Sequence, residues 1–203
     1  MSIYFDEHGL RGPIESLPAG LRLAFAAACA ERLLPAYREF SIATGREDAS
    51  LLAGILAELW RDASGHPMSE ERALSALRSC LSLVPDEDDG PWIESQAYAD
   101  DAAAAVCYCL RLRMSGRSEE AAWAARRAYE AVDYYVTNHL GVEVGEPARN
   151  HALVQQELLR QELDLLELAK ASAAEADLGA SIGSVQMRAR TDAMHFLGSR
   201  NGA

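Results

Sequence analysis

The sequence predicts an all-α, single-domain bundle of six or seven helices, and three observations support this class. The chain has 203 residues, of which 49% are hydrophobic, and that share is enough for one sizeable core. Much of it is alanine and β-branched residues are few, a composition that favours helices. Apolar residues recur three and four positions apart, whereas the period of two that is typical of strands does not recur.

The first predicted helix contains a proline. Its apolar stripe has helical spacing and comprises Leu23, Ala26, Ala30, Leu33, Tyr37 and Phe40. Pro35 lacks an N–H and its ring crowds the preceding turn, so we expect a kink or a restart there. Gly45 should end this helix. A second helix then carries Leu52, Ile55, Leu56, Leu59 and Trp60.

The next two predicted helices differ in character. The third begins at Ser69, whose hydroxyl can accept a free backbone N–H, and it stops at Pro85. The fourth runs from Trp92 to Met114 and is apolar almost all round between residues 102 and 110. A helix without a polar face belongs in the middle of a bundle, so we expect this one to be central and buried.

Gly116 should end the fourth helix, and Ser118 begins a fifth that extends to Leu140. A sixth shows two adjacent apolar rows, Val154, Leu158, Leu165 and Leu168 beside Leu159, Leu163 and Leu166. We divide the chain into an N-terminal extension (1–20) without helical period, a bundle core (21–171) and a C-terminal helical extension (172–203). That extension should pack on the core or on a neighbouring chain, which would make it a route to a homo-oligomer.

Charge and targeting signals bear on partners and location. The net charge of −12 repels phosphate backbones and anionic lipid headgroups, so we expect neither nucleic acid nor membrane as a partner. The longest apolar run is far shorter than the ~20 residues of a membrane span. Acids in the first residues, MSIYFDEHGLRG, are untypical of a signal peptide, which favours the cytoplasm. Cysteines 29, 80, 107 and 109 lie in apolar segments and should be buried, reduced thiols.

Several short motifs together resemble a known family. They are Cys29-x-Glu31-Arg32, Pro35-x-Tyr37, Phe40, Thr44–Gly45, Leu59–Trp60, the acidic loop Pro85–Asp89, Asp101–Ala102 and Ser115–Gly116. With them the chain resembles the YjaG-like bacterial family, a domain of unknown function (416), from about Leu17 to Lys170. The first twenty residues and the stretch after Ala171 depart from its pattern. The resemblance implies a helical cytosolic fold, and it brings no activity, cofactor or catalytic residue.

The residues themselves offer little for catalysis. Cys107 and Cys109 point about 200° apart on a helix, so they cannot share one metal ion. Asp192-x-x-His195 has the helical spacing of one half of a carboxylate-bridged metal site, but the sequence offers no second half. There is no glycine-rich phosphate loop. We therefore expect no catalytic residue, metal or cofactor.

Two groups of charged residues are the candidate sites. Asp101 precedes an alanine-rich turn and should be partly buried, and a buried acid needs a partner. We expect a structural ion pair from Arg32 or Arg38 to Asp101, with Glu31 beside it, and functional use of this cluster is the alternative. The second group is an acidic binding face of Asp86, Glu87, Asp88, Asp89, Glu157, Glu162 and Asp164.

Two functions remain open. The first is a non-enzymatic protein-binding module that docks a basic partner, for example as an acidic immunity or inhibitor protein. The alternative is a small metal-dependent enzyme that acts on a phosphorylated metabolite, with the metal held by Asp101 and the acids of the sixth helix. The negative charge and the missing catalytic constellation favour the first.

Overall fold

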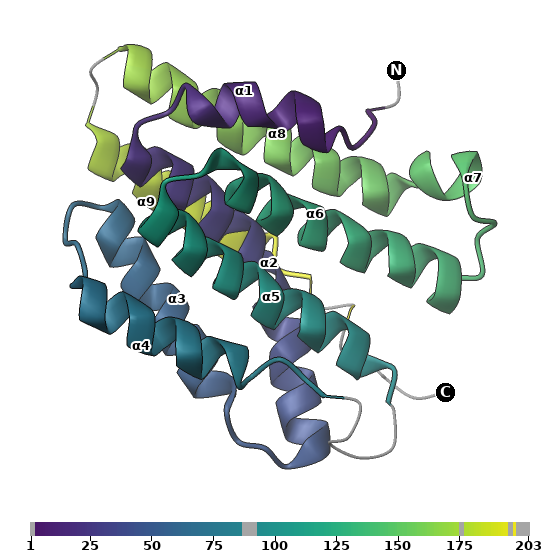
Figure 1. The fold of residues 1–203 in the computed structure, drawn as a ribbon. Helices are drawn as coiled ribbons and strands as arrows, with labels where there is room; N and C mark the ends of the chain where they lie inside the picture. Colours follow the sequence, from purple (N-terminus) through teal and green to yellow (C-terminus); the bar gives the residue numbers. More distant parts are fainter. Residues whose placement is uncertain (1–2, 87–92, 175–176, 195–196, 198–203) are drawn as a thin grey trace.

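The computed structural model describes residues 3–86, 93–174, 177–194 and 197. These residues form helices and no strand, which confirms the all-α class (Figure 1). In chain order the helices are α1 (Glu7–Glu15), α2 (Ala19–Thr44), α3 (Ala49–Ala63), α4 (Glu70–Leu81), α5 (Ser95–Ser115), α6 (Ser118–Tyr134), α7 (Glu146–Arg149), α8 (Ala152–Ala173) and α9 (Leu178–Thr191). A π-helix, Tyr135–His139, continues α6.

The described residues contain more helices than the six or seven predicted, and the additional ones are α1 and α7. Helix α7 is a single turn. Helix α1 lies where we expected no helical period, because its two glycines and Pro13 lower the helix propensity. It forms nevertheless, since Asp6 accepts the Gly9 N–H at 2.9 Å and Ile14 is buried in the core.

Helices α2 and α5 form the centre of the bundle. Helix α5 contacts α2, α3, α4 and α6, and the expectation of a buried central helix is confirmed. Helix α2 contacts α3, α5, α6, α8 and α9, and every residue from Ala24 to Ala30 is 0% exposed. That part of α2 is thus buried on all sides rather than along one stripe, because small alanine side chains let neighbouring helices approach from several directions.

Helix α2 passes through Pro35 without restarting. Figure 1 shows its axis changing direction towards the C-terminal half, as expected where a proline removes an N–H from the helix. In the turn before the proline, the Arg32 carbonyl accepts a hydrogen bond from the Met194 N–H at 2.8 Å. The C-terminal segment therefore docks next to the proline in α2.

Three predicted helix ends are confirmed. Gly45 and Gly116 follow α2 and α5 with φ of 68° and 69°, a left-handed conformation that glycine adopts without strain. Ser69 caps α4 by accepting the Arg72 N–H at 3.1 Å. Local sequence signals therefore fix these boundaries.

Helix α9 packs against α2 and α8 of the same chain, and Figure 1 shows it behind α2. In the part of the chain that the structure describes, no helix combines the length and the hydropathy that a membrane span requires.

The close packing of α2 on α3 gives a first prediction. A Cβ on Gly20 would lie 2.8 Å from the Ala63 carbonyl oxygen. We expect Gly20→Ala to lower the free energy of unfolding by about 1–3 kcal/mol, because a backbone carbonyl cannot move aside easily. Around Gly54 in α3 a Cβ meets nothing within 4 Å, so Gly54→Ala should raise that free energy by about 0.5–1 kcal/mol. Urea unfolding measures both, and equal effects would contradict the close approach.

Candidate functional site

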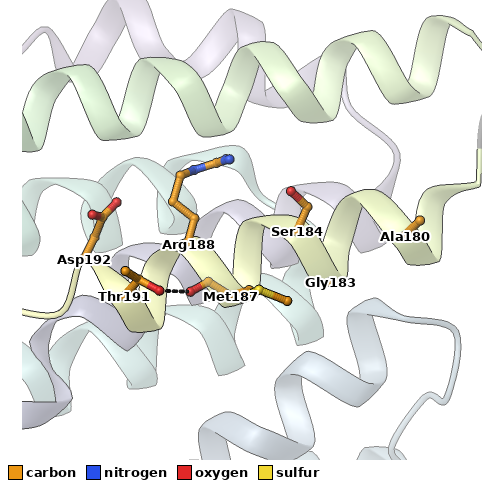
Figure 2. Close-up of a pocket in the computed structure, with 7 residues that line it drawn as sticks. All are labelled: Ala180, Gly183, Ser184, Met187, Arg188, Thr191 and Asp192. Carbon is orange, nitrogen blue, oxygen red and sulfur yellow. Dashed lines mark hydrogen bonds between the residues drawn. The ribbon is translucent and has the colours of Figure 1, made fainter.

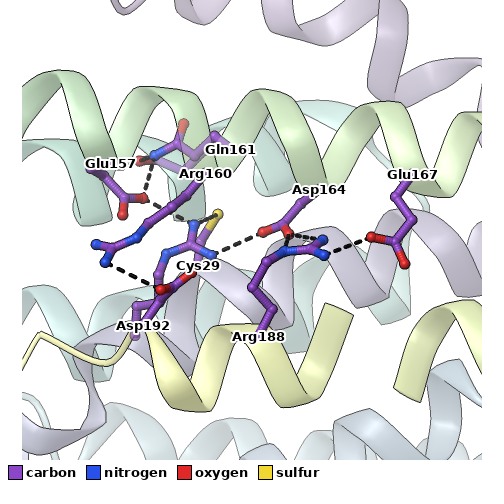
Figure 3. Close-up of polar contacts among 10 residues, drawn as sticks. Cys29, Glu157, Arg160, Gln161, Asp164, Glu167, Arg188 and Asp192 are labelled. Atoms are coloured by element: carbon purple, nitrogen blue, oxygen red, sulfur yellow. Dashed lines mark hydrogen bonds and ion pairs between the residues drawn. The ribbon is translucent and has the colours of Figure 1, made fainter. Parts of the chain in front are cut away.

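The centre of the candidate site is a buried arginine, Arg32 of α2, whose side chain is 1% exposed. Its Nη2 lies 2.9 Å from Glu157 Oε1, and its Nη1 lies 2.9 Å from Asp164 Oδ2 (Figure 3). The two carboxylates are seven residues apart on α8, so they project from the same face two turns from each other. Both are at most 1% exposed, so Arg32 joins α2 to α8 through a fully buried ion triad.

Gln161, one turn after Glu157, extends this network to α6. Its Nε2 donates to Glu157 Oε1 at 2.8 Å and to the Ala125 carbonyl at 3.0 Å. The Glu157 carboxylate is therefore shared between an arginine and an amide. Among the described atoms Arg32 Nε and Glu157 Oε2 have no hydrogen-bond partner, and a buried polar atom without a partner costs free energy.

Arg188 brings helix α9 into the network. Its Nη2 and Nε lie 2.6 and 3.0 Å from Asp164 Oδ1, and its Nη1 lies 2.7 Å from Glu167 Oε2. Hydrogen bonding and charge pairing with these acids raise the pKa of Arg188 above its usual value, although burial alone would lower it. We call Arg32, Glu157, Gln161, Asp164 and Arg188 the Arg32 network (Figure 3).

Cys29, one turn before Arg32, places a thiol beside the network. Its Sγ lies 3.4 Å from Arg32 Nη2. Burial raises the pKa of the Cys29 thiol to about 12, although the arginine lowers it. A thiol with this pKa stays protonated at neutral pH and is a poor nucleophile. The pKa of Cys109 is also raised by burial, and all four cysteines are buried and free, as the sequence predicted.

Glu31, next to Arg32 in the chain, points to other partners. Its Oε2 accepts a hydrogen bond from Trp60 Nε1 at 2.7 Å, and its Oε1 lies 3.1 Å from Arg190 Nε on α9. Just beyond α9, Asp192 lies 3.3 Å from Arg160 of α8. Together with Arg188, these ion pairs fasten α9 to α2 and α8 along its last two turns.

The predicted pairing of Asp101 with Arg32 or Arg38 is wrong. Asp101 Oδ1 lies 3.0 Å from Arg127 Nη1 of α6, whereas Arg32 faces α8 and Arg38 is exposed. Residues Glu31, Arg32 and Asp101 therefore do not form one cluster. Burial raises the pKa of Asp101 to about 7, because it outweighs the stabilising charge of Arg127.

The predicted acidic face is also divided by the structure. Glu157 and Asp164 are buried in the Arg32 network and cannot meet a partner, whereas Asp86 and Glu162 are exposed. Residues Glu87, Asp88 and Asp89 lie outside the described residues. Of the acids of α8 that we considered for a metal, Glu157, Asp164 and Glu167 are paired with arginines. Within the described residues, no three His, Cys, Asp or Glu side chains gather as ligands of one ion would.

Sequence reasoning missed Arg188 and Gln161, although a signal for the α8 part exists. Glu157, Gln161 and Asp164 follow one another at intervals of four and three between the buried residues Val154 and Leu168. Polar residues that keep the spacing of a buried row are expected to point inward and to need charged partners. No comparable local pattern connects α9 to this row.

Comparisons with known proteins agree with the fold. A family model described as "Protein of unknown function (DUF416)" matches residues 11–195. The chain is similar to the crystal structure, at 1.91 Å resolution, of a DUF416 family protein from Shewanella baltica OS155, with a TM-score of 0.76 and 18% sequence identity over 89% of this chain and 93% of that chain. At this identity the likeness shows the fold alone. No curated protein matches the chain.

The family match also corrects the limits of the predicted resemblance. We expected the stretch after Ala171 to depart from the pattern, but the match continues to residue 195. Helix α9 and its ion pairs to α2 and α8 therefore lie inside the matched region.

The buried ion triad gives a second prediction. Arg32→Met should lower the free energy of unfolding by about 3–5 kcal/mol, because it leaves two buried carboxylates without their shared cation. Adding Glu157→Gln removes one of these charges and should recover part of the loss. Arg72→Met is the control, since its ion pair with Glu58 is exposed and should be worth at most about 1 kcal/mol. If Arg32→Met and Arg72→Met cost the same in urea unfolding, the triad does not have this role.

The raised pKa of Asp101 gives a third prediction. The pKa of this carboxyl is about 7 in the folded protein and about 4 in the unfolded chain. At any pH between about 4 and about 7, folding is therefore accompanied by the uptake of a proton. The contribution of Asp101 to the free energy of unfolding is most favourable at low pH and is lost as the pH rises from about 4 to about 7. Asp101→Asn removes this titration. As the pH rises from about 4 to about 7, the stability of the wild type should therefore fall relative to that of the variant. Urea unfolding at several pH values tests this, and parallel curves would refute it.

Proposed function

The chain belongs to the DUF416 family, whose description gives no activity. From the charges on the surface of this chain, we propose that it is a protein-binding module for a basic partner. The observation that carries this proposal is the way in which the chain distributes its charges. Net charge says little about a fold, but its placement decides which molecules approach the surface.

The arginines are largely engaged by carboxylates of the same chain, at N···O distances between 2.6 and 3.9 Å. The paired arginines are Arg11, Arg32, Arg46, Arg72, Arg113, Arg117, Arg126, Arg127, Arg160, Arg188 and Arg190. Exposed glutamates that form no ion pair within the described residues are Glu15, Glu39, Glu47, Glu70, Glu71, Glu143, Glu146 and Glu162. The excess of negative charge therefore lies on the surface.

One end of the bundle combines such acids with exposed apolar side chains. Glu39 and Ile42 lie one turn apart near the end of α2, and Glu47 follows in the loop to α3. Ile42 is 66% exposed, which is unusual for isoleucine and places an apolar anchor between two acids.

The loop after α4 lies at the same end. Arg46 Nη2, in the loop that carries Glu47, donates to the Ser82 carbonyl at 3.4 Å. Leu81, which is 46% exposed, precedes that serine, and exposed Asp86 follows it. We call Glu39, Ile42, Glu47, Leu81 and Asp86 the α2 end face.

An apolar centre with an acidic rim suits a protein partner that carries arginine or lysine around an apolar patch. In such interfaces the apolar anchors supply affinity and the charged rim accelerates the encounter. An immunity or inhibitor protein that neutralises a basic toxin is one concrete form of this function.

The fourth prediction tests this function. Basic proteins encoded beside this gene are titrated with the purified chain, and one should bind with an association rate that falls as salt is added. Glu39→Lys with Glu47→Lys should lower that rate by about tenfold at low salt. Glu70→Lys with Glu71→Lys changes the charge equally on α4 and should have a much smaller effect.

Failure of every basic neighbour to bind would overturn the proposal. An equal fall of the association rate in the two double variants would show a general effect of net charge. The α2 end face would then no longer be the proposed binding surface. Thermal unfolding of both variants confirms that each is folded.

A further inference from the structure

Helix α8 carries an apolar row that the other described residues cover only in part. Leu159, Leu163 and Leu166 are 46%, 45% and 47% exposed. With Lys170 and Ala173 they are spaced four, three, four and three residues apart. This is the spacing of a coiled-coil seam, in which one helix packs along another. The inward side of α8 already packs in the core through Val154, Leu158 and Leu168, so the described chain leaves this outward seam partly exposed.

A trough runs beside this ridge of leucines. Its apolar and small lining residues are Leu163, Leu166, Ala171 and Ala174 of α8 and its end and Ser181 of α9, and the charged Glu167, Lys170 and Arg188 complete it. The outward side of α9 continues it with small residues, among them Ala180, Gly183 and Ser184, which Figure 2 shows along one face of that helix. A Cβ on Gly183 would meet nothing within 4 Å, so the trough is open to solvent there.

We infer that this surface binds a second copy of the chain, with the two α8 helices packed antiparallel about a two-fold axis near Leu166. A surface with a ridge beside a trough is complementary to itself after a two-fold rotation, because the ridge of each copy enters the trough of the other. A twofold interface of this kind also closes after two copies, so it does not continue into a filament.

The sizes of the opposed side chains agree with this register. Residues equally far from position 166 face each other across the axis. Leu166 then faces the partner's Leu166 at the axis, and Leu159 faces the partner's Ala173. The two Leu166 side chains thus form an apolar centre, and the larger Leu159 meets the smaller Ala173, as close packing at an interface core requires.

The charges select the antiparallel direction. Glu162 and Lys170 lie four residues on either side of position 166 and both are exposed. In the antiparallel pair, Glu162 of each copy faces the partner's Lys170, so two opposite-charge contacts form. A parallel pair would bring lysine to lysine and glutamate to glutamate, which is unfavourable. Lys170 is the only lysine of the chain.

The fifth prediction is a dimer in solution. Sedimentation equilibrium over a range of concentrations should give a species with twice the chain mass of 22.0 kDa. Leu163→Glu should raise the dimer dissociation constant by about tenfold or more, because it places a charge in the apolar seam. Leu51 of α3 is also 46% exposed, so Leu51→Glu is the matched control and should leave the dimer unchanged.

A charge exchange tests the register. Glu162→Lys and Lys170→Glu should each weaken the dimer, since each opposes like charges, and the two together should restore it. A wild type that stays monomeric at all concentrations, an unchanged dimer in Leu163→Glu, or an exchange without rescue would overturn the inference. Circular dichroism confirms that every variant is folded.

Salt separates this dimer from the proposed basic partner. Binding of a basic protein weakens as salt screens opposite charges. Association of two chains that each carry −12 is driven by apolar contacts against a long-range repulsion, so added salt should not weaken it. A dimer that dissociates on addition of salt would contradict an apolar seam.

Discussion

The position of Arg32 between Glu157 and Asp164 is the interaction on which much of this architecture depends. A guanidinium in the middle of an alanine-rich helix is tolerable only if carboxylates meet it there, because an isolated buried charge is very costly. Those carboxylates come from α8, and Asp164 in turn requires Arg188 of α9. One buried cation on α2 therefore determines where the last two long helices of the chain must pack.

The sequence was sufficient to predict those features of the fold that depend on residues close together in the chain. The stripes of α2 to α6 and the glycines after α2 and α5 predicted helices and their ends, because spacing and backbone conformation depend on near neighbours. Glu157 and Asp164 were predicted to lie on an exposed acidic binding face, since acids on helices usually face water. Their burial depends on Arg32, which is 125 and 132 residues away, and on α9. Asp101 was correctly expected to be buried, but its partner Arg127 could not be selected among many arginines without the packing of α5 on α6.

The described surface thus has two regions of different character. The α2 end face is acidic around an apolar anchor and suits a basic partner, whereas the outward face of α8 has balanced charges around a row of leucines. They involve different helices, so an assembly of two copies would leave both α2 end faces available. Each copy could then bind its partner independently, and two linked sites on one multivalent partner would bind more tightly than either alone.

The hydrogen bond from the Met194 N–H to the Arg32 carbonyl has a consequence for biosynthesis. Together with the Arg190–Glu31 pair, which spans 159 residues, it joins α2 to α9 and the segment that follows α9. The Arg32 side chain is made on the ribosome well before Glu157, Asp164 and α9. Until those segments emerge this cation lacks its native carboxylate partners, so the core can reach its final packing only after α9 has been synthesised.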